Sequence, residues 1–424
     1  MKRYVTRPVI AWAFYDWANS AFATTVMAGF FPLFFKQYWG SGLDSTTSTF
    51  QLGVGNAVAS LFIVLAAPLL GAIADRGGLR KRFLLSFALL GVICTAGLSA
   101  VGAGEWAAAL GLFVAATVGF MGANVFYDAL LTVVARAEDW DMVSAIGYAL
   151  GYLGGGLLFG INVAMTLSPD SFGLDSAEEA VRYSFLSVAL WWTLFSVPLL
   201  LMVKEPPVMQ RLSGWAVACA GYRQVIDTFR HIRQLRPVFL FLVAYWLYID
   251  GVDTIVRMAV DYGLAIGLEQ THLIGALLIT QFVGFPAALA FGWLGQQIGA
   301  KRGIFIAIGV YVAVTLWAVL IEETWEFYLL AACIGLVQGG IQALSRSLYA
   351  RLIPTDKAAE FFGFYNMLGK FAALLGPLMV GVVSVATDSH RAGMLSLILL
   401  FVAGAWLLSR VDVGGEARAG AADR

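Results

Sequence analysis

Long apolar segments alternate with short polar ones along almost the whole chain. Twelve of these segments are long enough to cross a hydrocarbon layer of about 30 Å as α-helices. They cover residues 9–35, 51–73, 83–103, 106–134, 142–167, 183–203, 237–264, 271–295, 303–321, 326–350, 361–386 and 391–409. The pattern therefore predicts an all-α membrane protein with twelve transmembrane helices.

Charged side chains within the apolar segments are few and unevenly placed. A charge at the centre of a bilayer costs about 2.5–3.5 kcal/mol on the insertion scale, so it has to face another polar group or a hydrated cavity. Nearly all of these charges lie in segments 1, 4, 7 and 10, with one lysine in segment 11: Asp16, Asp128, Asp250, Asp253, Arg257, Arg346 and Lys370. Because the placement recurs every three segments in both halves, it predicts a polar path through the protein.

Lysine and arginine indicate the direction of the chain in the membrane. They gather in both tails and in the even-numbered loops, whereas acidic residues gather in the opposite loops. The positive-inside rule then places both termini in the cytoplasm. The predicted organisation is an N-terminal six-helix bundle over 1–203, a cytoplasmic linker over 204–236, a C-terminal six-helix bundle over 237–410 and a disordered tail over 411–424. The linker contains an amphipathic helix, which we interpret as a connector rather than a regulatory element.

Composition supports this class and excludes several others. The chain of 424 residues is 60% hydrophobic and 13% charged, with a mean hydropathy of +0.80. Its net charge of zero gives no reason to expect a nucleic-acid partner. The three cysteines are isolated, so neither a disulfide framework nor a metal site is indicated. The segments contain no P-loop, metalloprotease motif or catalytic triad, so we expect no cofactor and no enzymatic activity.

One loop sequence occurs twice, at the same place in each half. GAIADRGGLRKR follows the second segment at 71–82, and GWLGQQIGAKR follows the eighth at 292–302. Gln296 stands in the second copy where the first copy has Asp75. Duplicated halves that rock about a central site are a common transporter plan. The repeat predicts two pseudo-symmetric six-helix bundles.

The repeated loop resembles the signature loop of the major facilitator superfamily. Two further sequences, YDWANSAF at 15–22 and YIDGVDT at 248–254, are similar to the "unknown major facilitator" family, relatives of the autophagy-linked vacuolar amino-acid effluxers of fungi. The resemblance covers the whole chain. It implies the facilitator fold, a central cavity lined by helices 1, 4, 7 and 10, and an amino-acid solute.

Polar side chains at helical spacing define a candidate cavity. Spacings of three, four and seven residues place side chains on one face of a helix, and amides in a membrane need partners. We interpret these residues as a binding site for a solute and a proton, with structural ion pairs or helix capping as the alternative. The set comprises Asp16, Asn19, Asp250, Asp253, Arg257, Gln338, Gln342, Asn366 and Lys370.

Two acids of the seventh segment are the leading proton carriers. A poorly solvated carboxylate can bind and release a proton during transport. Asp250, near the middle of the membrane, is the first candidate and Asp253 the second. Replacing Asp250 with asparagine is expected to abolish coupling without unfolding the protein. Arg257 could pair with Asp253, and Lys370 could neutralise Asp16.

A second group of residues is predicted to form a gate at the cytoplasmic side. The resemblance implies that the acid of the fourth segment pairs with the basic end of the first signature loop. Such charge pairs can favour one of two rigid-body states, although a static ion-pair network is the alternative. Gln296 should make this latch asymmetric. The group comprises Gly71, Asp75, Arg76, Arg80, Arg82, Asp128 and Arg346.

These observations favour a secondary active transporter that works by alternating access. Mixed acid, base and amide groups suit a small polar or zwitterionic solute, with amino acids as the first choice, and we expect coupling to a proton. The alternative is a membrane scaffold or receptor that keeps the fold without moving a solute. We further expect a monomer in the lipid bilayer of a bacterial inner membrane, because the chain is rich in alanine and glycine and lacks a glycosylation sequon.

Overall fold

The computed structural model describes residues 4–205, 215–231, 235–265, 270–320 and 323–413, and for some helical residues within these ranges only the backbone. Every regular element in these ranges is a helix. The first half contains α1 (Arg7–Ala21), α2 (Phe31–Phe34), α3 (Ser45–Gly77), α4 (Arg80–Leu98), α5 (Trp106–Val134), α6 (Trp140–Leu167) and α7 (Ala177–Met202). The second half contains α9 (Arg236–Ala265), α10 (Gln270–Ile298), α11 (Ala300–Ala318), α12 (Thr324–Leu352), α13 (Ala358–Thr387) and α14 (His390–Ser409), and α8 (Trp215–His231) lies between the halves.

Short helices complete the chain. Two π-helical stretches, η1 (Phe22–Phe30) and η2 (Phe35–Trp39), continue α1 and α2 into one crossing. Three 3₁₀ turns, η3 (Ala137–Asp139), η4 (Pro169–Phe172) and η5 (Thr355–Lys357), lie between longer helices.

The helices agree with the predicted transmembrane segments. Eleven helical stretches of the described residues are long and apolar enough to cross a membrane, beginning with Arg7–Trp39. The remaining long helix, α13, has 30 residues, and its part Leu375–Thr387 is apolar. A helix therefore corresponds to each of the twelve predicted segments, although α4 ends at Leu98 where the predicted third segment reaches residue 103, and the predicted all-α membrane fold is confirmed.

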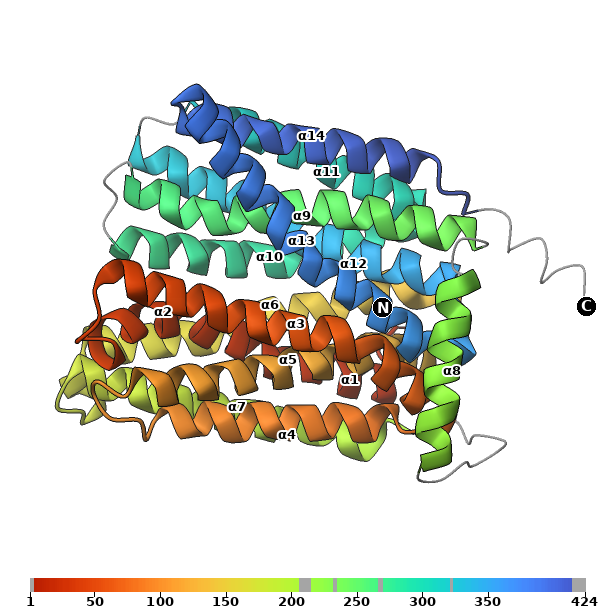
Figure 1. Ribbon diagram of the computed structural model, residues 1–424, viewed down its shortest axis with the longest axis horizontal. Helices are drawn as coiled ribbons and strands as arrows, with labels where there is room; N and C mark the ends of the chain where they lie inside the picture. Colours follow the sequence, from red (N-terminus) through yellow and green to blue (C-terminus); the bar gives the residue numbers. More distant parts are fainter. Residues whose placement is uncertain (1–3, 206–214, 232–234, 266–269, 321–322, 414–424) are drawn as a thin grey trace, which may run out of the picture.

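The helices form two bundles that meet along two seams. Helices α1 to α7 form one bundle and α9 to α14 the other (Figure 1). At one seam α3 packs against α13, and at the other α6 packs against α10. Helix α8 lies crosswise over one end of the molecule (Figure 1). We call this end the linker side and the opposite end the far side.

The side chains on the outer surface and at the far-side helix ends match their surroundings. Large apolar side chains such as Leu65 and Leu190 are exposed on the outside of the bundles, as helices surrounded by lipid require. Three helices that begin in far-side loops have polar caps: Asp44, Ser176 and Ser389 each accept a backbone N–H from the first turn. These caps satisfy donors that have no partner within the helix.

The repeated loops perform the same structural task in both halves. Lys81 Nζ donates to the carbonyl oxygens of Leu200 (3.0 Å) and Val203 (2.9 Å) at the end of α7. Lys301 Nζ donates to those of Ser409 (2.9 Å) and Val411 (2.7 Å) at the end of α14. A lysine at a helix C-terminus satisfies free carbonyls and complements the helix dipole. Each loop thus fixes the last helix of its own bundle.

On the linker side, α3 and α13 approach so closely that glycine is required. A Cβ atom added at Gly71 would lie 2.2 Å from the carbonyl oxygen of Ala359, and one added at Gly363 would lie 2.7 Å from that of Ala67. Real Cβ contacts are never this short, and neither obstacle is a side chain that can rotate away. The seam between α3 and α13 is therefore closed on the linker side.

Candidate functional site: a polar cavity between the bundles

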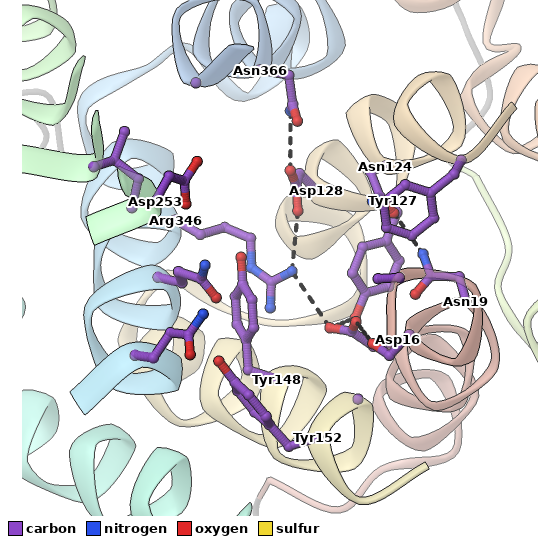
Figure 2. A pocket seen from close by; sticks show the side chains of 18 of the residues that line it. Asp16, Asn19, Asn124, Tyr127, Asp128, Tyr148, Tyr152, Asp253, Arg346 and Asn366 are labelled. Carbon is purple, nitrogen blue, oxygen red and sulfur yellow. Dashed lines mark hydrogen bonds and ion pairs between the residues drawn. The ribbon is translucent and has the colours of Figure 1, made fainter. Parts of the chain in front are cut away.

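A cavity of about 340 Å³ lies between the two bundles. Helices α1, α5 and α6 line it from the first bundle, and α9, α10, α12 and α13 line it from the second. Figure 2 shows its side chains pointing toward one another across the space between the bundles. The predicted site residues that line it are Asp16, Asn19, Asp128, Asp253, Gln338, Gln342, Arg346 and Asn366.

Arg346 of α12 forms the centre of the polar network. Its guanidinium donates from Nε to Ser144 Oγ (2.9 Å), from Nη2 to the carbonyl oxygen of Ser144 (2.9 Å) and from Nη1 to Asp128 Oδ1 (3.1 Å). Asp16 Oδ2 lies 4.0 Å from Nη1. The side chain is 1% exposed. Each of these partners belongs to the first bundle, so this residue ties the second bundle to the first.

Aromatic rings of the first bundle surround the same guanidinium. Its central carbon lies 4.9 Å from the ring centroid of Trp12, 5.3 Å from that of Tyr127 and 4.3 Å from that of Tyr148. Cation–π attraction is strongest where the cation is withdrawn from water. Gly147 makes the space, since a Cβ there would lie 3.1 Å from Arg346 Nη2 and closer still to Tyr127 and Trp12.

Asp16 and Asn19 share one face of α1, as predicted. Asp16 accepts hydrogen bonds from the hydroxyls of Tyr127 (3.1 Å) and Ser20 (3.3 Å). The Asn19 amide nitrogen donates to Asn124 Oδ1 at 2.6 Å. A hydroxyl can donate to a carboxylate or accept from a carboxylic acid. The surroundings of Asp16 can therefore satisfy both of its protonation states.

The predicted pairing of Asp128 with the basic end of the first signature loop is wrong. Asp128 binds Arg346 and also accepts from the Asn366 amide nitrogen at 3.1 Å. Arg80 binds Asp75 instead, and Arg82 is exposed. The reason is orientation, because Asp128 faces the second bundle across the cavity whereas the basic end of the loop lies at the edge of the linker side.

Asp250 does not line the cavity, so the prediction that it faces the solute path is wrong. Its side chain is 0% exposed, and Oδ1 accepts from the Gly376 backbone N–H (3.0 Å) and the Thr254 hydroxyl (3.3 Å). Residues three apart on a helix differ by about 60° in direction, so Asp253 faces the cavity while Asp250 faces α13. Pro377 interrupts the hydrogen-bond ladder of α13 beside this contact. The side chains of Arg257 and Lys370 lie outside the described residues, and so do their predicted pairings.

At the linker-side seam, Asp75 caps a helix of the other bundle. Its carboxylate accepts the backbone N–H groups of Ala359 (3.1 Å) and Glu360 (2.9 Å) in the first turn of α13. Arg80 Nε donates to it at 2.6 Å, and Arg80 Nη2 donates to the carbonyl oxygen of Thr355 at 3.1 Å. A carboxylate at a helix N-terminus satisfies free donors and favours the helix dipole. This contact holds α3 against α13.

The second seam contains an ion pair that the sequence analysis missed. Arg351 at the end of α12 binds Asp141 at the start of α6 through both carboxylate oxygens, at 2.6 and 2.9 Å. The Ser347 hydroxyl donates to the same carboxylate at 2.5 Å. Gln296, which replaces the loop acid here, accepts from the Tyr4 hydroxyl at 2.7 Å. Asp141 and Arg351 each stand one residue outside a predicted segment, which is why counting charges within segments did not find them.

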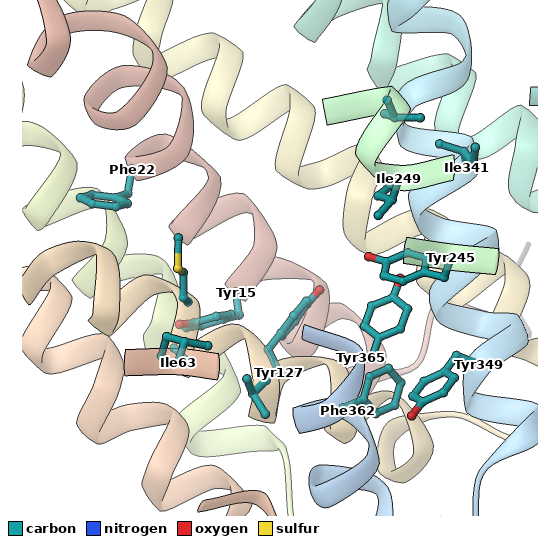
Figure 3. Close-up of a cluster of buried hydrophobic side chains, with 14 of the residues drawn as sticks. Tyr15, Phe22, Ile63, Tyr127, Tyr245, Ile249, Ile341, Tyr349, Phe362 and Tyr365 are labelled. Atoms are coloured by element: carbon teal, nitrogen blue, oxygen red, sulfur yellow. The ribbon is translucent and has the colours of Figure 1, made fainter. Parts of the chain in front are cut away.

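Tyrosines are among the further lining residues that the sequence analysis missed. Tyr148 and Tyr152 of α6 and Tyr245 of α9 line the cavity with Tyr365 of α13. The rings of Tyr245 and Tyr365 stack at a centroid distance of 4.1 Å, and Figure 3 shows them beside Tyr349. The four-residue spacing of Tyr148 and Tyr152 was the available signal, but tyrosine in an apolar helix is equally typical of a packed core.

Two six-helix bundles with a polar cavity between them define a transporter of the major facilitator superfamily. The chain is an integral membrane protein, and its substrate is a small-molecule solute. The sequence matches the family described as "Vacuole effluxer Atg22 like" over residues 38–420, and the chain belongs to this family.

Individual relatives agree with this assignment. The chain is 38% identical to an uncharacterized MFS-type transporter, YxiO, of Bacillus subtilis, over 97% of this chain and 96% of that protein. It is 22% identical to autophagy-related protein 22 of Saccharomyces cerevisiae, over 95% and 91% of the two chains. The match to autophagy-related protein 22 of Yarrowia lipolytica, at 26% identity, covers 66% of this chain and 51% of that protein, so the chain spans about half of that relative.

Solved structures share the fold. The human organic anion transporter MFSD10 (TETRAN) aligns with a TM-score of 0.72 at 17% identity, over 95% of this chain and 99% of that one. The proton:xylose symporter XylE aligns with a TM-score of 0.69 at 15% identity, over 96% and 94%.

Proposed function

We propose that the protein is a secondary active transporter of a small polar or zwitterionic solute, which binds in the cavity between the bundles. The observation that carries this proposal is the lining of the cavity: Asp16, Asp128 and Asp253 lie with Arg346 among amide and hydroxyl groups. Groups of both charge signs suit a solute that carries an ammonium and a carboxylate group. Amino acids are therefore the first candidate class.

The positions of the contacts between the bundles support alternating access. Asp75 with α13 and Asp141 with Arg351 close the linker side, so transport requires these contacts to break while the far side closes. We place the linker side in the cytoplasm of a bacterial inner membrane, because lysine and arginine gather in its loops. Both walls of the cavity come from one chain, which supports a monomer as the working unit.

Asp16 is the proposed proton site. It lines the cavity at 8% exposure, and it shares the Arg346 guanidinium with Asp128 at a longer distance, 4.0 Å against 3.1 Å. Its hydroxyl partners can serve the charged or the neutral form. Protonation of Asp16 weakens one contact between the bundles, and this connects proton binding to the change of state.

Replacing Asp16 with asparagine is expected to separate coupling from transport. Uptake driven by a pH gradient into vesicles should fall to background, because asparagine cannot bind a proton. Exchange of labelled for unlabelled solute should continue, because it needs no net proton movement. The solute for this assay is the compound that most raises the melting temperature of the purified protein among amino acids, nucleosides, sugars and organic acids.

The control for this experiment is Asp356→Asn, at an exposed position of the linker side whose backbone carbonyl accepts a hydrogen bond from Arg80. It should leave both activities unchanged. Gradient-driven uptake at the normal rate in Asp16→Asn would remove Asp16 as the proton site. If no compound stabilises the protein and none is transported, the scaffold or receptor alternative gains support.

A further inference from the structure

Helix α8 connects the two bundles through side-chain contacts as well as through the chain itself. It crosses the linker side (Figure 1) and packs against α3. A connector that only spanned the distance would need exposed polar residues. Instead, two polar side chains of α8 are buried, Gln224 at 6% and Thr228 at 7% exposure.

Gln224 bridges the seam between α3 and α13. Its amide oxygen accepts from Arg76 Nε of the first bundle. Its amide nitrogen donates to Glu360 Oε2 of the second bundle. One neutral amide therefore contacts a cation of one bundle and an anion of the other, and its two ends match these two charges.

We propose that α8 is a clamp that holds the linker side closed, with Gln224 as the residue that positions the two bundles. This inference rests on the alternating access of the proposed function, but not on the identity of the solute or on the proton. When α3 and α13 separate, Gln224 has to release Arg76 or Glu360. Movement of α8 is then part of each transport cycle.

The surroundings of Glu360 give the clamp its strength. Its side chain is 0% exposed, and its Oε1 has no hydrogen-bond partner within the described part of the chain. Hydrogen bonds to a charged group are stronger than neutral ones, and a buried charged group that loses its partner is strongly penalised. Glu360 therefore favours the closed seam only while α8 supplies the Gln224 amide.

The test exchanges the two partners and measures the separation of the bundles without any solute. Cys94, Cys219 and Cys333 are replaced with serine, and spin labels are attached at Arg82→Cys and Asp356→Cys, which are exposed positions in different bundles. Gln224→Glu places a second carboxylate against Glu360, so the population with separated bundles should rise at least about tenfold, because like charges in contact repel strongly. Combining Gln224→Glu with Glu360→Gln restores one amide and one carboxylate and should return the closed distance.

Two further variants keep the result interpretable. Tyr222→Glu adds the same charge at an exposed position of α8 and should leave the distances unchanged. Gln224→Ala removes both bonds without adding charge and should also increase the separated population, which covers the case in which Gln224→Glu does not fold. Unchanged distances in the folded Gln224 variants, or a double variant no more closed than Gln224→Glu, would overturn the clamp. A protein that transports nothing could still show the clamp, so the two proposals fail separately.

Discussion

Replacing Arg346 with glutamine is expected to abolish transport, in both gradient-driven uptake and solute exchange. The guanidinium is buried and bonds Asp128 and Ser144 of the opposite bundle. Breaking a buried ion pair by removing one partner usually costs about 3–5 kcal/mol. Because the lost contacts join the bundles, this loss falls on the closed state of the linker side. Transport should decrease by at least about a hundredfold in reconstituted vesicles.

Two further variants test whether the loss of transport is specific to the Arg346 guanidinium. Arg346→Lys keeps the charge but not the planar fork that reaches two partners at once, so its activity should also be strongly reduced. Arg410→Gln, at an exposed arginine, should behave as the unaltered protein. Normal transport by Arg346→Gln would show that the central network is a static feature of the fold.

Replacing Gly71 with alanine should prevent the linker side from closing. The added Cβ would lie 2.2 Å from the carbonyl oxygen of Ala359, and a backbone atom cannot rotate away. Overpacking of this kind costs about 1–3 kcal/mol, whereas alanine alone would favour the helix by about 1 kcal/mol. The difference is up to about 2 kcal/mol, so we expect up to about a thirtyfold loss of transport, and spin labels across the seam should show a larger population with separated bundles.

Gly53→Ala is the matched control for this experiment. It lies on the same helix, and a Cβ there has no heavy atom within 4 Å. It should leave transport unchanged and slightly stabilise the protein, as helix propensity predicts. Equal behaviour of the two alanine variants would contradict the closed seam.

Much of the fold could be predicted because it depends on local properties of the chain. Hydropathy and length identify a transmembrane helix without knowledge of its neighbours. Helical spacing likewise placed Gln338, Gln342 and Arg346 on one face, and all three line the cavity. Burying a charge in a membrane is costly enough that the charges of segments 1, 4 and 10 had to meet a polar surface.

The other features of the site depend on contacts between helices, and residue spacing within one helix does not predict these contacts. Asp250 and Asp253 are both acids on one predicted face of the seventh segment, but Asp250 accepts from the Gly376 backbone of α13 whereas Asp253 lines the cavity. The Asp141 and Arg351 pair forms because α6 begins on the linker side beside the end of α12. Nothing in the sequence of the basic linker distinguishes Gln224, because its partners Arg76 and Glu360 come from the two bundles that α8 contacts.

The most direct test of the central claim, that side chains of both bundles form one hydrated solute-binding cavity, is the protection of an introduced cysteine. Gln342→Cys, in a background without the native cysteines, is treated with a small charged thiol reagent in the presence and absence of the amino acid that most stabilises the protein. Because Gln342 lines the cavity, labelling should slow as the amino-acid concentration rises, whereas labelling of the exposed Asp170→Cys should not change. Equal labelling rates at Gln342→Cys with and without the amino acid would contradict the account.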